Sequence, residues 1–338
     1  MHTSAQVISF LNGSGWFDTT IIPAQVRFLA AGEYNENWLI SVAETPQVLR
    51  INHGSQLGLA NQIAYEWAVL LAVAPSGVTP RPYYIDTHPA GLAGGTLLME
   101  YLPGTPLDYA RHSARAAHIF AKIHTCPVPE APSTVDHAVS ASDTSLLRQP
   151  DPIASIAAES MGLLERYPDH PLRDVKGLLL AHHERVVRLA DDHGPMLRED
   201  AQVIVNTEVN SGNFIMHDAG DHLVDWEKAV ISTRYQDLAH FLAPTTTLWK
   251  TSHLYGSPER DAFLTAYADA LYNTSGERLD RDACRLCTDV MIQVVLLRGL
   301  SWCYMAFHEY TSTRRELAHT ETLRTIQRYL ENTPWFLR

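Results

Sequence analysis

The chain has 338 residues, of which 46% are apolar and 19% charged, so it is an ordinary globular protein too long for one comfortable hydrophobic core. Its formal net charge of −12 disfavours a nucleic-acid partner, because a nucleic-acid groove needs concentrated Lys and Arg. The sequence has no run of 18 apolar residues and Met1 to Phe10 lacks signal-peptide features, which favours a cytoplasmic protein without a membrane partner.

The N-terminal part of the chain has the pattern of a small α+β lobe. A short helix and a turn come first. From Val26 onward, apolar runs of strand length predict two strands, a third at P-Q-V-L-R-I-N, and two more at P-R-P-Y-Y-I-D and G-T-L-L-M-E-Y-L. One helical stretch, Leu57 to Val73, interrupts these five strands.

After L-P-G-T-P-L the pattern becomes mainly helical. Helices are predicted over Ala110 to His124, Asp151 to Tyr167, Val175 to Asp192, and from Leu238 to the end. Residues 127–152 are rich in Pro, Ser, Ala and Asp and predict an irregular connection. We place the boundary between the lobes near Leu102 to Pro106, which divides the chain into residues 1–103 and 104–338.

A turn and two charged residues in the first lobe are candidates for phosphate contacts. In the turn A-G-E-Y-N-E-N-W, Gly32 and Asn35 tolerate tight backbone geometry, and N–H groups there are able to face phosphate. A plain hairpin turn is the alternative. Arg50 lies in an apolar strand and Glu66 on the following helix. They form an ion pair in one interpretation, and are two solvent-facing charges in the other.

The stretch V-I-V-N-T-E-V-N-S-G-N-F-I-M-H-D-A-G-D-H-L-V-D-W-E predicts a strand, a polar loop and a hairpin. It holds Glu208, Asn213 and Asp225, whose oxygen atoms suit magnesium and proton transfer. A turn acid and an Asx turn are the alternative interpretation of Asp225 and Asn213. Phosphoryl transfer from ATP needs a backbone turn, a cation, an acid, metal ligands and a base, and the chain offers a candidate for each in this order.

Four segments then point to a known family: L-L-M-E-Y-L-P-G-T-P-L, N-T-E-V-N-S-G-N-F-I-M, L-V-D-W-E-K-A and Y-Q-D-L-A-H-F-L. Together they resemble the aminoglycoside phosphotransferase and choline kinase family, from about Val26 to Leu242. L-R-G-L-S-W, at Leu297 to Trp302, is similar to the family's C-terminal helices. The resemblance implies an α+β, bilobal protein-kinase-like fold, with a small five-stranded N-terminal lobe carrying one helix and a larger, mainly helical C-terminal lobe.

The resemblance also implies ATP, or another nucleoside triphosphate, together with Mg²⁺ and a small-molecule acceptor. Asp225 would bind the magnesium that bridges the phosphates, with Asn213 as the second ligand. Asp237 would accept backbone N–H bonds and brace the catalytic loop. Adenine would contact the backbone of the segment that joins the lobes. The expected nucleotide-binding residues are Gly32, Asn35, Arg50, Glu66, Glu100, Tyr101 and Leu102.

The catalytic loop departs from the family pattern H-G-D, because this chain has Asn206, Thr207 and Glu208 there. Glu208 keeps a carboxylate, but its extra methylene moves the oxygens by ~1.5 Å, and a misplacement of ~1 Å can cost ~100-fold in rate. Since the transition state is loose and depends on positioning and charge, we expect slower transfer rather than none. Asn206 would replace part of the hydrogen bonding of the missing histidine.

Three further patterns have simpler interpretations. Cys284 and Cys287 form a C-x-x-C, but within a helical pattern they are expected to be reduced core thiols. The pair His182 and His183 is expected to be solvated rather than metal-bound. Trp249 and Trp302 are the kind of residues that form an aromatic box for a quaternary ammonium group, but core packing is the expected use.

Two hypotheses of function result. The first is an ATP-dependent phosphotransferase that moves the γ-phosphate to a hydroxyl of an aminoglycoside, amino alcohol or sugar-like acceptor, with Glu208 as the base. The second is a pseudokinase, a nucleotide- or ligand-binding protein in which the Asp-to-Glu change impairs transfer. The sequence does not specify the acceptor, the choice between ATP and GTP, or the oligomeric state.

Overall fold

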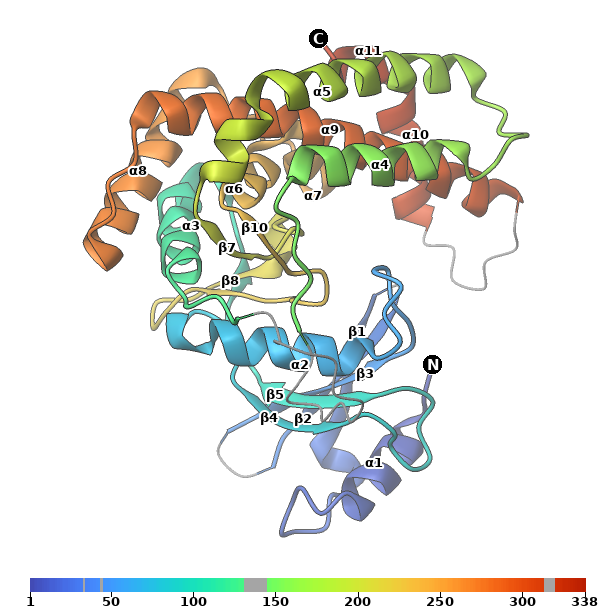
Figure 1. The fold of residues 1–338 in the computed structure, drawn as a ribbon. Coiled ribbons are helices and arrows are strands. Elements are labelled where there is room, and N and C mark those ends of the chain that lie inside the picture. Colours follow the sequence, from blue (N-terminus) through green and yellow to red (C-terminus); the bar gives the residue numbers. More distant parts are fainter. Residues whose placement is uncertain (33, 43–44, 131–144, 313–319) are drawn as a thin grey trace. The chain divides into compact units, whose positions relative to one another are not determined.

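The computed structural model (Figure 1) describes residues 1–32, 34–42, 45–130, 145–312 and 320–338. Residues 131–144 of the predicted irregular connection therefore lie outside the described residues. Two compact units make up the chain. The first unit contains Met1–Pro106, Cys126–Leu147 and Asn213–Val230, and the second contains Leu107–Thr125, Arg148–Gly212 and Ile231–Arg338.

The first unit is built on a five-stranded antiparallel sheet, which confirms the five predicted strands. Its strands are β1 (Val26–Ala31), β2 (Asn35–Ile40), β3 (Gln47–Asn52), β4 (Pro82–Asp86) and β5 (Thr96–Glu100). Their spatial order is β1-β2-β3-β5-β4, so β3 is the central strand. Arg50 lies on this strand, opposite Asn37 of β2 and Leu97 of β5.

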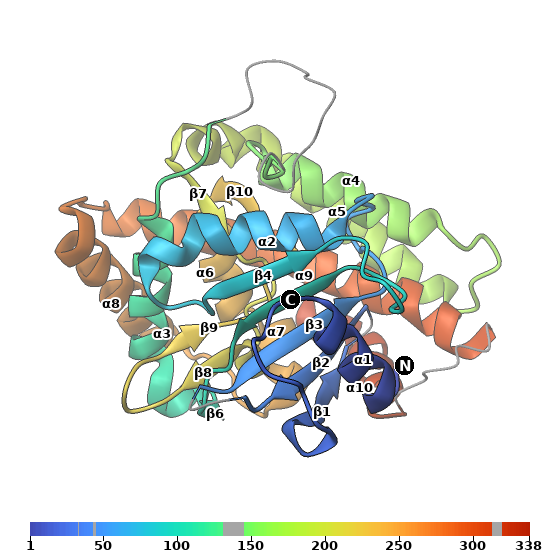
Figure 2. The same ribbon diagram turned by 90° about the horizontal axis from the view of Figure 1, so that it is seen from below.

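Two helices lie on opposite faces of this sheet, α1 (Ser4–Gly13) and α2 (Gln62–Val73) (Figures 1 and 2). Side chains alternate along a strand. Leu49 and Ile51 of β3 accordingly join the apolar cluster of α1, and Arg50 points to the face of α2. The predicted helix from Leu57 begins only at Gln62, because the side chain of Asn61 caps it by accepting the Ala64 N–H.

A smaller three-stranded sheet also belongs to the first unit. It has the order β6-β8-β9 and consists of β6 (Thr105–Pro106), β8 (Phe214–Met216) and β9 (His222–Leu223). The chain comes very close to β8 at Gly104, whose φ is 156°. A Cβ atom at Gly104 would lie 2.7 Å from the carbonyl oxygen of Met216, so only glycine fits there.

The second unit is mainly helical, as predicted. Its helices are α3 (Tyr109–His124), α4 (Pro152–Glu165), α5 (Arg173–Glu199), α6 (Tyr235–Leu242), α7 (Pro244–Lys250), α8 (Ser257–Ser275), α9 (Arg281–Ser312), α10 (Thr320–Glu331) and α11 (Thr333–Phe336). β7 (Gln202–Val205) pairs with β10 (Val230–Thr233) in a two-stranded sheet. Short 3₁₀ helices occur at Pro23–Gln25, Ala74–Ser76 and Ser211–Asn213.

The long helix α9 is the centre of the second unit, where it packs against α4, α5, α6 and α10 (Figure 1). Its length and mean hydropathy would suit a membrane span, but 72% of the apolar window is buried inside the unit. A buried apolar helix of this kind is typical of a protein core.

Candidate active site

A buried charged network occupies one face of the first unit's sheet. Arg50 is 6% exposed, and its Nη1 atom lies 2.5 Å from Glu66 Oε1 and 3.0 Å from Asp225 Oδ1. Its Nε atom donates to Asn37 Oδ1 at 3.1 Å. The structure thus has the ion pair between Arg50 and Glu66, rather than two solvent-facing charges.

The electrostatics of this network keep Arg50 charged. Burial alone would lower the pKa of its guanidinium, but the carboxylates of Glu66, Asp225 and Glu227 outweigh burial and raise the pKa. Burial raises the pKa of Glu66, and the Arg50 guanidinium opposes that change. A cation held between two carboxylates has a fixed position, which is what a phosphate-contacting group requires.

The two expected magnesium ligands belong to the β8–β9 region of the first unit. Asn213 immediately precedes β8, and its carbonyl oxygen accepts the N–H of Val224 at 2.8 Å. This bond brings the backbone of Asn213 next to the residue that precedes Asp225. An amide and a carboxylate are hard oxygen donors, so the donor set fits Mg²⁺. Asp225 is less buried than Glu66, its partner in the network, with 29% of its side chain exposed.

Asp225 has an unusual backbone conformation with φ of 66°. Non-glycine residues seldom adopt this left-handed region, and such residues cluster at functional sites. The conformation follows the short β9 strand and directs the carboxylate towards Arg50.

Glu227 is a member of this face that the sequence interpretation missed. Its Oε2 atom accepts a hydrogen bond from Asn35 Nδ2 at 2.5 Å, and its carbonyl oxygen accepts one from Gln62 Nε2 at 2.7 Å. Both partners lie at the start of an element, β2 and α2 respectively. The segment D-W-E could have indicated Glu227, because it places a second acid two residues after Asp225.

The predicted phosphate turn is shorter than the sequence indicated. Residues 31–38 were expected to form it, but β2 already begins at Asn35, which pairs with Asn52 of β3. The side chain of Asn35 is buried on Glu227, and the N–H of Gly32 donates to the carbonyl oxygen of Asn35 at 2.9 Å. These two residues therefore close a hairpin, and their phosphate contact stays a prediction.

The segment expected to contact adenine begins at the end of β5. The N–H of Glu100 donates to the Arg81 carbonyl at 2.8 Å, and that of Tyr101 to the Pro46 carbonyl at 3.4 Å. Leu102 follows without a backbone hydrogen bond to any residue that the structure describes. Of the three residues predicted here, Leu102 is therefore the one whose N–H is available to a ligand.

The expected catalytic loop lies in the second unit, where it follows β7. The carboxylate of Asp237, on α6, is fully buried and accepts the N–H groups of Asn206 and Thr207, each at 2.8 Å. Its Oδ2 atom also lies 3.4 Å from Nε2 of the buried His124. These are the backbone contacts expected of a bracing acid. Thr207 has φ of 65°, in the same rare region as Asp225.

Glu208, the expected base, follows directly. Its N–H donates to Asn206 Oδ1 at 3.0 Å, so Asn206 closes a turn under it. The carbonyl oxygen of Glu208 accepts the N–H of Asn210 at 3.0 Å. The side chain of Glu208 is only half-buried.

The three simpler interpretations have different outcomes. Cys284 and Cys287 are buried free thiols as predicted, and burial raises their pKa values to about 12 and about 11. The prediction that His182 is solvated was wrong, because His182 is 1% exposed and its Nε2 atom contacts the Gln293 carbonyl at 2.9 Å. The helix carries this histidine on its inner face.

The two tryptophans pack against each other and against a third ring. The ring centroids of Trp249 and Trp302 lie 5.9 Å apart at 74°, and Tyr329 lies 5.6 Å from Trp249. Edge-to-face contacts of this kind stabilise a core. The geometry favours the packing interpretation over an aromatic box.

A small antiparallel sheet with a buried Arg–Glu pair, together with a mainly helical unit carrying an acid-braced loop, defines a kinase-like phosphotransferase. The chain belongs to the phosphotransferase enzyme family, whose model matches residues 25–285. No curated protein matches the chain.

Solved structures share the fold at low sequence identity. An ethanolamine kinase of Plasmodium vivax is 12% identical with a TM-score of 0.65, and the match covers 98% of this chain and 88% of that one. An amicoumacin kinase solved with AMP-PNP and Ca²⁺ is 15% identical with a TM-score of 0.63, over 98% and 96% of the two chains. A spectinomycin phosphotransferase in complex with ADP and spectinomycin is 12% identical with a TM-score of 0.55, over 90% and 88%.

Proposed function

We propose that the protein is a small-molecule kinase that moves the γ-phosphate of ATP to an acceptor hydroxyl. The observation that carries this proposal is the buried network of Arg50, Glu66 and Asp225. Arg50 and Glu66 are buried away from water at a desolvation cost and Asp225 beside them is partly exposed, so we expect the three charges to have a function. In a family of phosphotransferases, the purpose they fit is to hold nucleotide phosphates and their metal.

Each residue of the first unit has a specific role in the proposal. Arg50 contacts phosphate oxygens, and Glu66 holds the guanidinium in place. Asn213 and Asp225 would hold Mg²⁺, which would supply positive charge to neutralise the phosphates. The N–H of Leu102 donates to the adenine ring, because the preceding two N–H groups are already bonded within the protein.

The second unit supplies the base. Glu208 accepts the proton of the acceptor hydroxyl while the hydroxyl oxygen bonds to the γ-phosphorus and the bond to the β,γ-bridging oxygen breaks, which releases ADP. Asp237 holds the loop by its two backbone hydrogen bonds. Glu208 is longer than the expected Asp, so the proposed turnover is slow.

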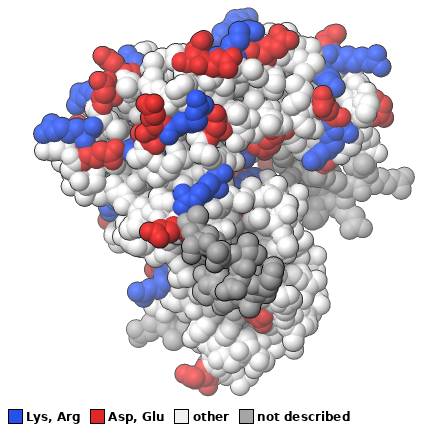
Figure 3. All heavy atoms as spheres, viewed as in Figure 1, with Lys and Arg blue, Asp and Glu red and all other residues white. Residues whose placement is uncertain are grey.

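The acceptor is proposed to be an aminoglycoside, an amino alcohol or a sugar-like molecule. Structural neighbours are named for spectinomycin, amicoumacin and ethanolamine. On the face in Figure 3, acidic and basic side chains of the second unit are intermixed rather than separated. The net charge of −12 is thus not gathered into one acidic patch on that face, and charge alone does not select a strongly cationic acceptor. We propose a cytoplasmic location, without a nucleic-acid or membrane partner.

The proposal is tested by ATP turnover. Purified protein with Mg²⁺ and ATP is assayed for ADP release against a panel of amino alcohols, aminoglycosides and sugars. We expect turnover with at least one acceptor, and a loss of ~100-fold or more in Asp225→Ala, because the metal then lacks its carboxylate. Asp218→Ala, an exposed acid of the β8–β9 turn, is the matched control and should retain full turnover. Equal rates in the parent and Asp225→Ala would contradict the proposal.

A second candidate is a pseudokinase, which the sequence Asn206-Thr207-Glu208 specifically favours. A pseudokinase binds nucleotide without turnover for any member of the panel. Glu208→Asp distinguishes the two, because a shorter carboxylate restores the spacing of the usual base. A gain of turnover in Glu208→Asp from an inactive parent supports the pseudokinase, whereas turnover in the parent contradicts it.

A further inference from the structure

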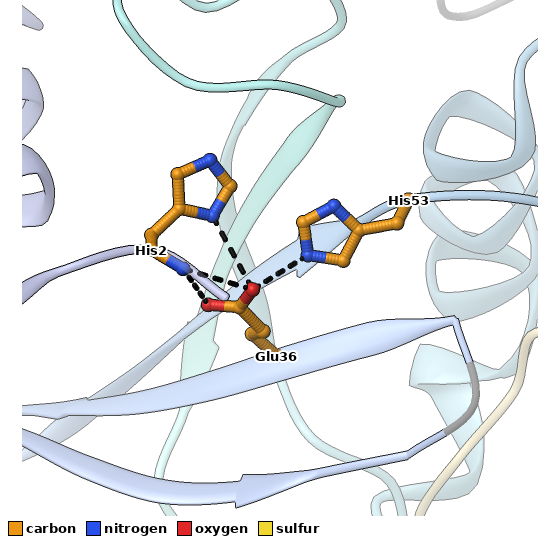
Figure 4. A group of neighbouring side chains, drawn as sticks. All are labelled: His2, Glu36 and His53. Carbon is orange, nitrogen blue, oxygen red and sulfur yellow. Dashed lines mark hydrogen bonds and ion pairs between the residues drawn. The ribbon is translucent and has the colours of Figure 1, made fainter. Parts of the chain in front are cut away.

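A second cluster of metal-binding side chains lies in the first unit, apart from the residues of the proposed reaction. His2 precedes α1, Glu36 lies on β2 and His53 follows β3, and Figure 4 shows His2 and His53 converging on the carboxylate of Glu36. Glu36 Oε1 lies 2.9 Å from His53 Nε2 and 3.4 Å from His2 Nδ1. One ligand atom from each residue falls within 4.8 Å of the other two.

The carboxylate of this cluster is buried and charged. The side chain of Glu36 is 3% exposed and that of His2 8%. The backbone N–H of His2 donates to both Glu36 oxygens, at 3.1 and 3.0 Å, and the Trp38 indole N–H donates to Oε2 at 3.3 Å, which favours the charged carboxylate. His2 Nδ1 is buried and forms no hydrogen bond with any residue that the structure describes. This nitrogen faces Glu36 Oε1 at 3.4 Å without a hydrogen bond, and a cation bound by both atoms would satisfy the two of them.

The hydrogen bond at the far side of His53 determines which of its nitrogens has a lone pair. Its Nδ1 atom lies 3.1 Å from the carbonyl oxygen of Ala93, which can only accept, so Nδ1 carries the proton. In the neutral ring, Nε2 then presents a lone pair to Glu36 Oε1 at 2.9 Å. Two lone pairs at this distance repel unless a cation lies between them. A backbone carbonyl that fixes the histidine tautomer is the usual outer contact of a metal-bound imidazole.

The backbone holds Ala93 close to His53. Gly94 has φ of 121°, and a Cβ atom there would lie 1.9 Å from the carbonyl oxygen of Asn52. Only glycine permits this approach, and the N–H of Asn52 donates to Gly95 O at 2.9 Å. The orientation of the His53 ring is therefore built into the fold. His53 also lines a pocket of about 490 Å³, so this one of the three side chains borders a cavity.

We propose that Glu36, His53 and His2 bind a divalent transition ion of the Zn²⁺ class. Zn²⁺ bound at ~2.0–2.1 Å in a tetrahedron separates its ligand atoms by ~3.3 Å, and the separations of 2.9 and 3.4 Å bracket that value. Two imidazoles and one carboxylate favour Zn²⁺ or Co²⁺ over Mg²⁺, which prefers oxygen ligands only. The fourth position takes water. The bound ion would link the segment before α1 to the five-stranded sheet.

The three ligands are unequal. His2 Nε2 accepts the N–H of Ala93 at 3.0 Å, so in the metal-free protein its proton is on Nδ1. Binding at Nδ1 moves that proton to Nε2 and gives up the bond to Ala93. His53 gives up nothing, because its Nε2 already has a free lone pair. We therefore expect His53 and Glu36 to contribute more to metal affinity than His2.

The test uses metal-stripped, tag-free full-length protein without nucleotide, titrated with Zn²⁺ alone by calorimetry and with Co²⁺ alone by visible absorption. We expect one equivalent bound, the strong visible bands of four-coordinate cobalt, and a rise in Tm with Zn²⁺. Glu36→Gln and His53→Gln should each weaken binding by ~100-fold or more, and His2→Ala by ~10-fold. His88→Gln removes an exposed histidine of the same pocket and should change nothing.

Two controls keep the result unambiguous. Asp225→Asn removes a proposed magnesium ligand and should leave Zn²⁺ binding intact, so failure of the kinase proposal does not affect this one. His53 has 34% of its side chain exposed, so His53→Gln should fold even if Glu36→Gln does not. Unchanged Zn²⁺ affinity in folded His53→Gln, or no binding by the parent at micromolar Zn²⁺, would overturn the proposal.

Discussion

Within the part of the chain that the structure describes, two non-glycine residues have left-handed backbone conformations, Thr207 with φ of 65° and Asp225 with φ of 66°. Each such residue costs about 1–3 kcal/mol and persists only where its surroundings determine it. Here Asp237 binds the N–H of Thr207, and Arg50 binds the carboxylate of Asp225. The family pattern has glycine where this chain has Thr207, and glycine adopts that conformation without strain. The strain thus coincides with the proposed catalytic loop and metal ligand.

Arg50 provides a prediction at the residue scale. Arg50→Met leaves Glu66 buried without its cation, so we expect the free energy of unfolding to fall by about 3–5 kcal/mol. Urea unfolding followed by circular dichroism measures this change. Turnover should also be lost, because no cation then contacts phosphate.

The double variant Arg50→Met with Glu66→Leu separates stability from function. Replacing both members of a buried pair by apolar groups is often neutral, so most of the lost stability should return while turnover stays absent. If turnover returned with stability, Arg50 would be a structural residue only.

At the scale of elements, the catalytic loop depends on a neighbouring helix. β7 ends at Val205, and the loop after it has two buried N–H groups that bind Asp237 of α6. A buried loop without such partners would be unstable. His124 of α3 lies against the same carboxylate, so three elements meet at Asp237.

Asp237→Ala should therefore destabilise the second unit. It leaves two buried backbone N–H groups unsatisfied, which costs about 1–3 kcal/mol each. We expect a Tm lower by several degrees, together with faster hydrogen exchange at Asn206 and Thr207. Asp192→Ala, an exposed acid on α5, is the matched control and should leave both unchanged. A normal Tm in folded Asp237→Ala would show that these bonds contribute little.

The sequence predicted the elements well where the pattern is local. Alternating apolar residues located the five strands, and helical spacing located α3 and α5. The sequence-based prediction failed where the environment of a side chain depends on residues far away in the sequence. Asn35 looked like a turn residue, but its side chain is satisfied by Glu227, 192 positions along the chain. His182 looked like a surface residue. Its contact is the carbonyl of Gln293, which is 111 positions away and therefore invisible to a local pattern.

The candidate site shows the same division. Asn213 and Asp225 were recognised from motifs whose spacing is short. The sequence did not show that the N–H of Leu102 is available. That depends on the neighbouring N–H groups, which donate to the carbonyls of Arg81 and Pro46. Nor did the sequence show the cluster of His2, Glu36 and His53, whose members have no motif and meet only through the register of the sheet.

At the scale of the whole molecule, buried histidines make stability depend on pH. Among the residues that the structure describes, burial lowers the pKa of the buried His124, His170 and His182 and of the half-buried His222. In the unfolded chain each has an ordinary pKa of about 6.5. Below that pH the unfolded chain takes up protons that the folded protein does not. The contribution of these histidines to the free energy of unfolding is therefore complete above pH ~6.5. As the pH decreases from that value, the free energy of unfolding decreases by up to ~1.4 kcal/mol per pH unit per histidine.

His182 provides the clearest test of this pH dependence. Its Nε2 donates to the Gln293 carbonyl and its Nδ1 accepts from Arg185 Nη2 at 2.8 Å, so a second proton would face a guanidinium. In His182→Gln, the decline of the Tm between pH 7 and pH 5 should be shallower than in the parent. His118→Gln, at an exposed histidine of α3, should keep the parent's slope. An identical slope in His182→Gln would contradict the prediction.

The first unit draws on three stretches of chain, and this sets the order in which it can form during synthesis. Gln62 and Tyr65 of α2 donate to the carbonyls of Glu227 and Ala229, and β6 pairs with β8. A ribosome that has made only the sheet and α2 has not yet made these partners. The first unit is complete only once Val230 has emerged, when the loop at 206–212 has already been translated. Although its sheet is encoded first, this unit cannot finish folding as an independent N-terminal domain.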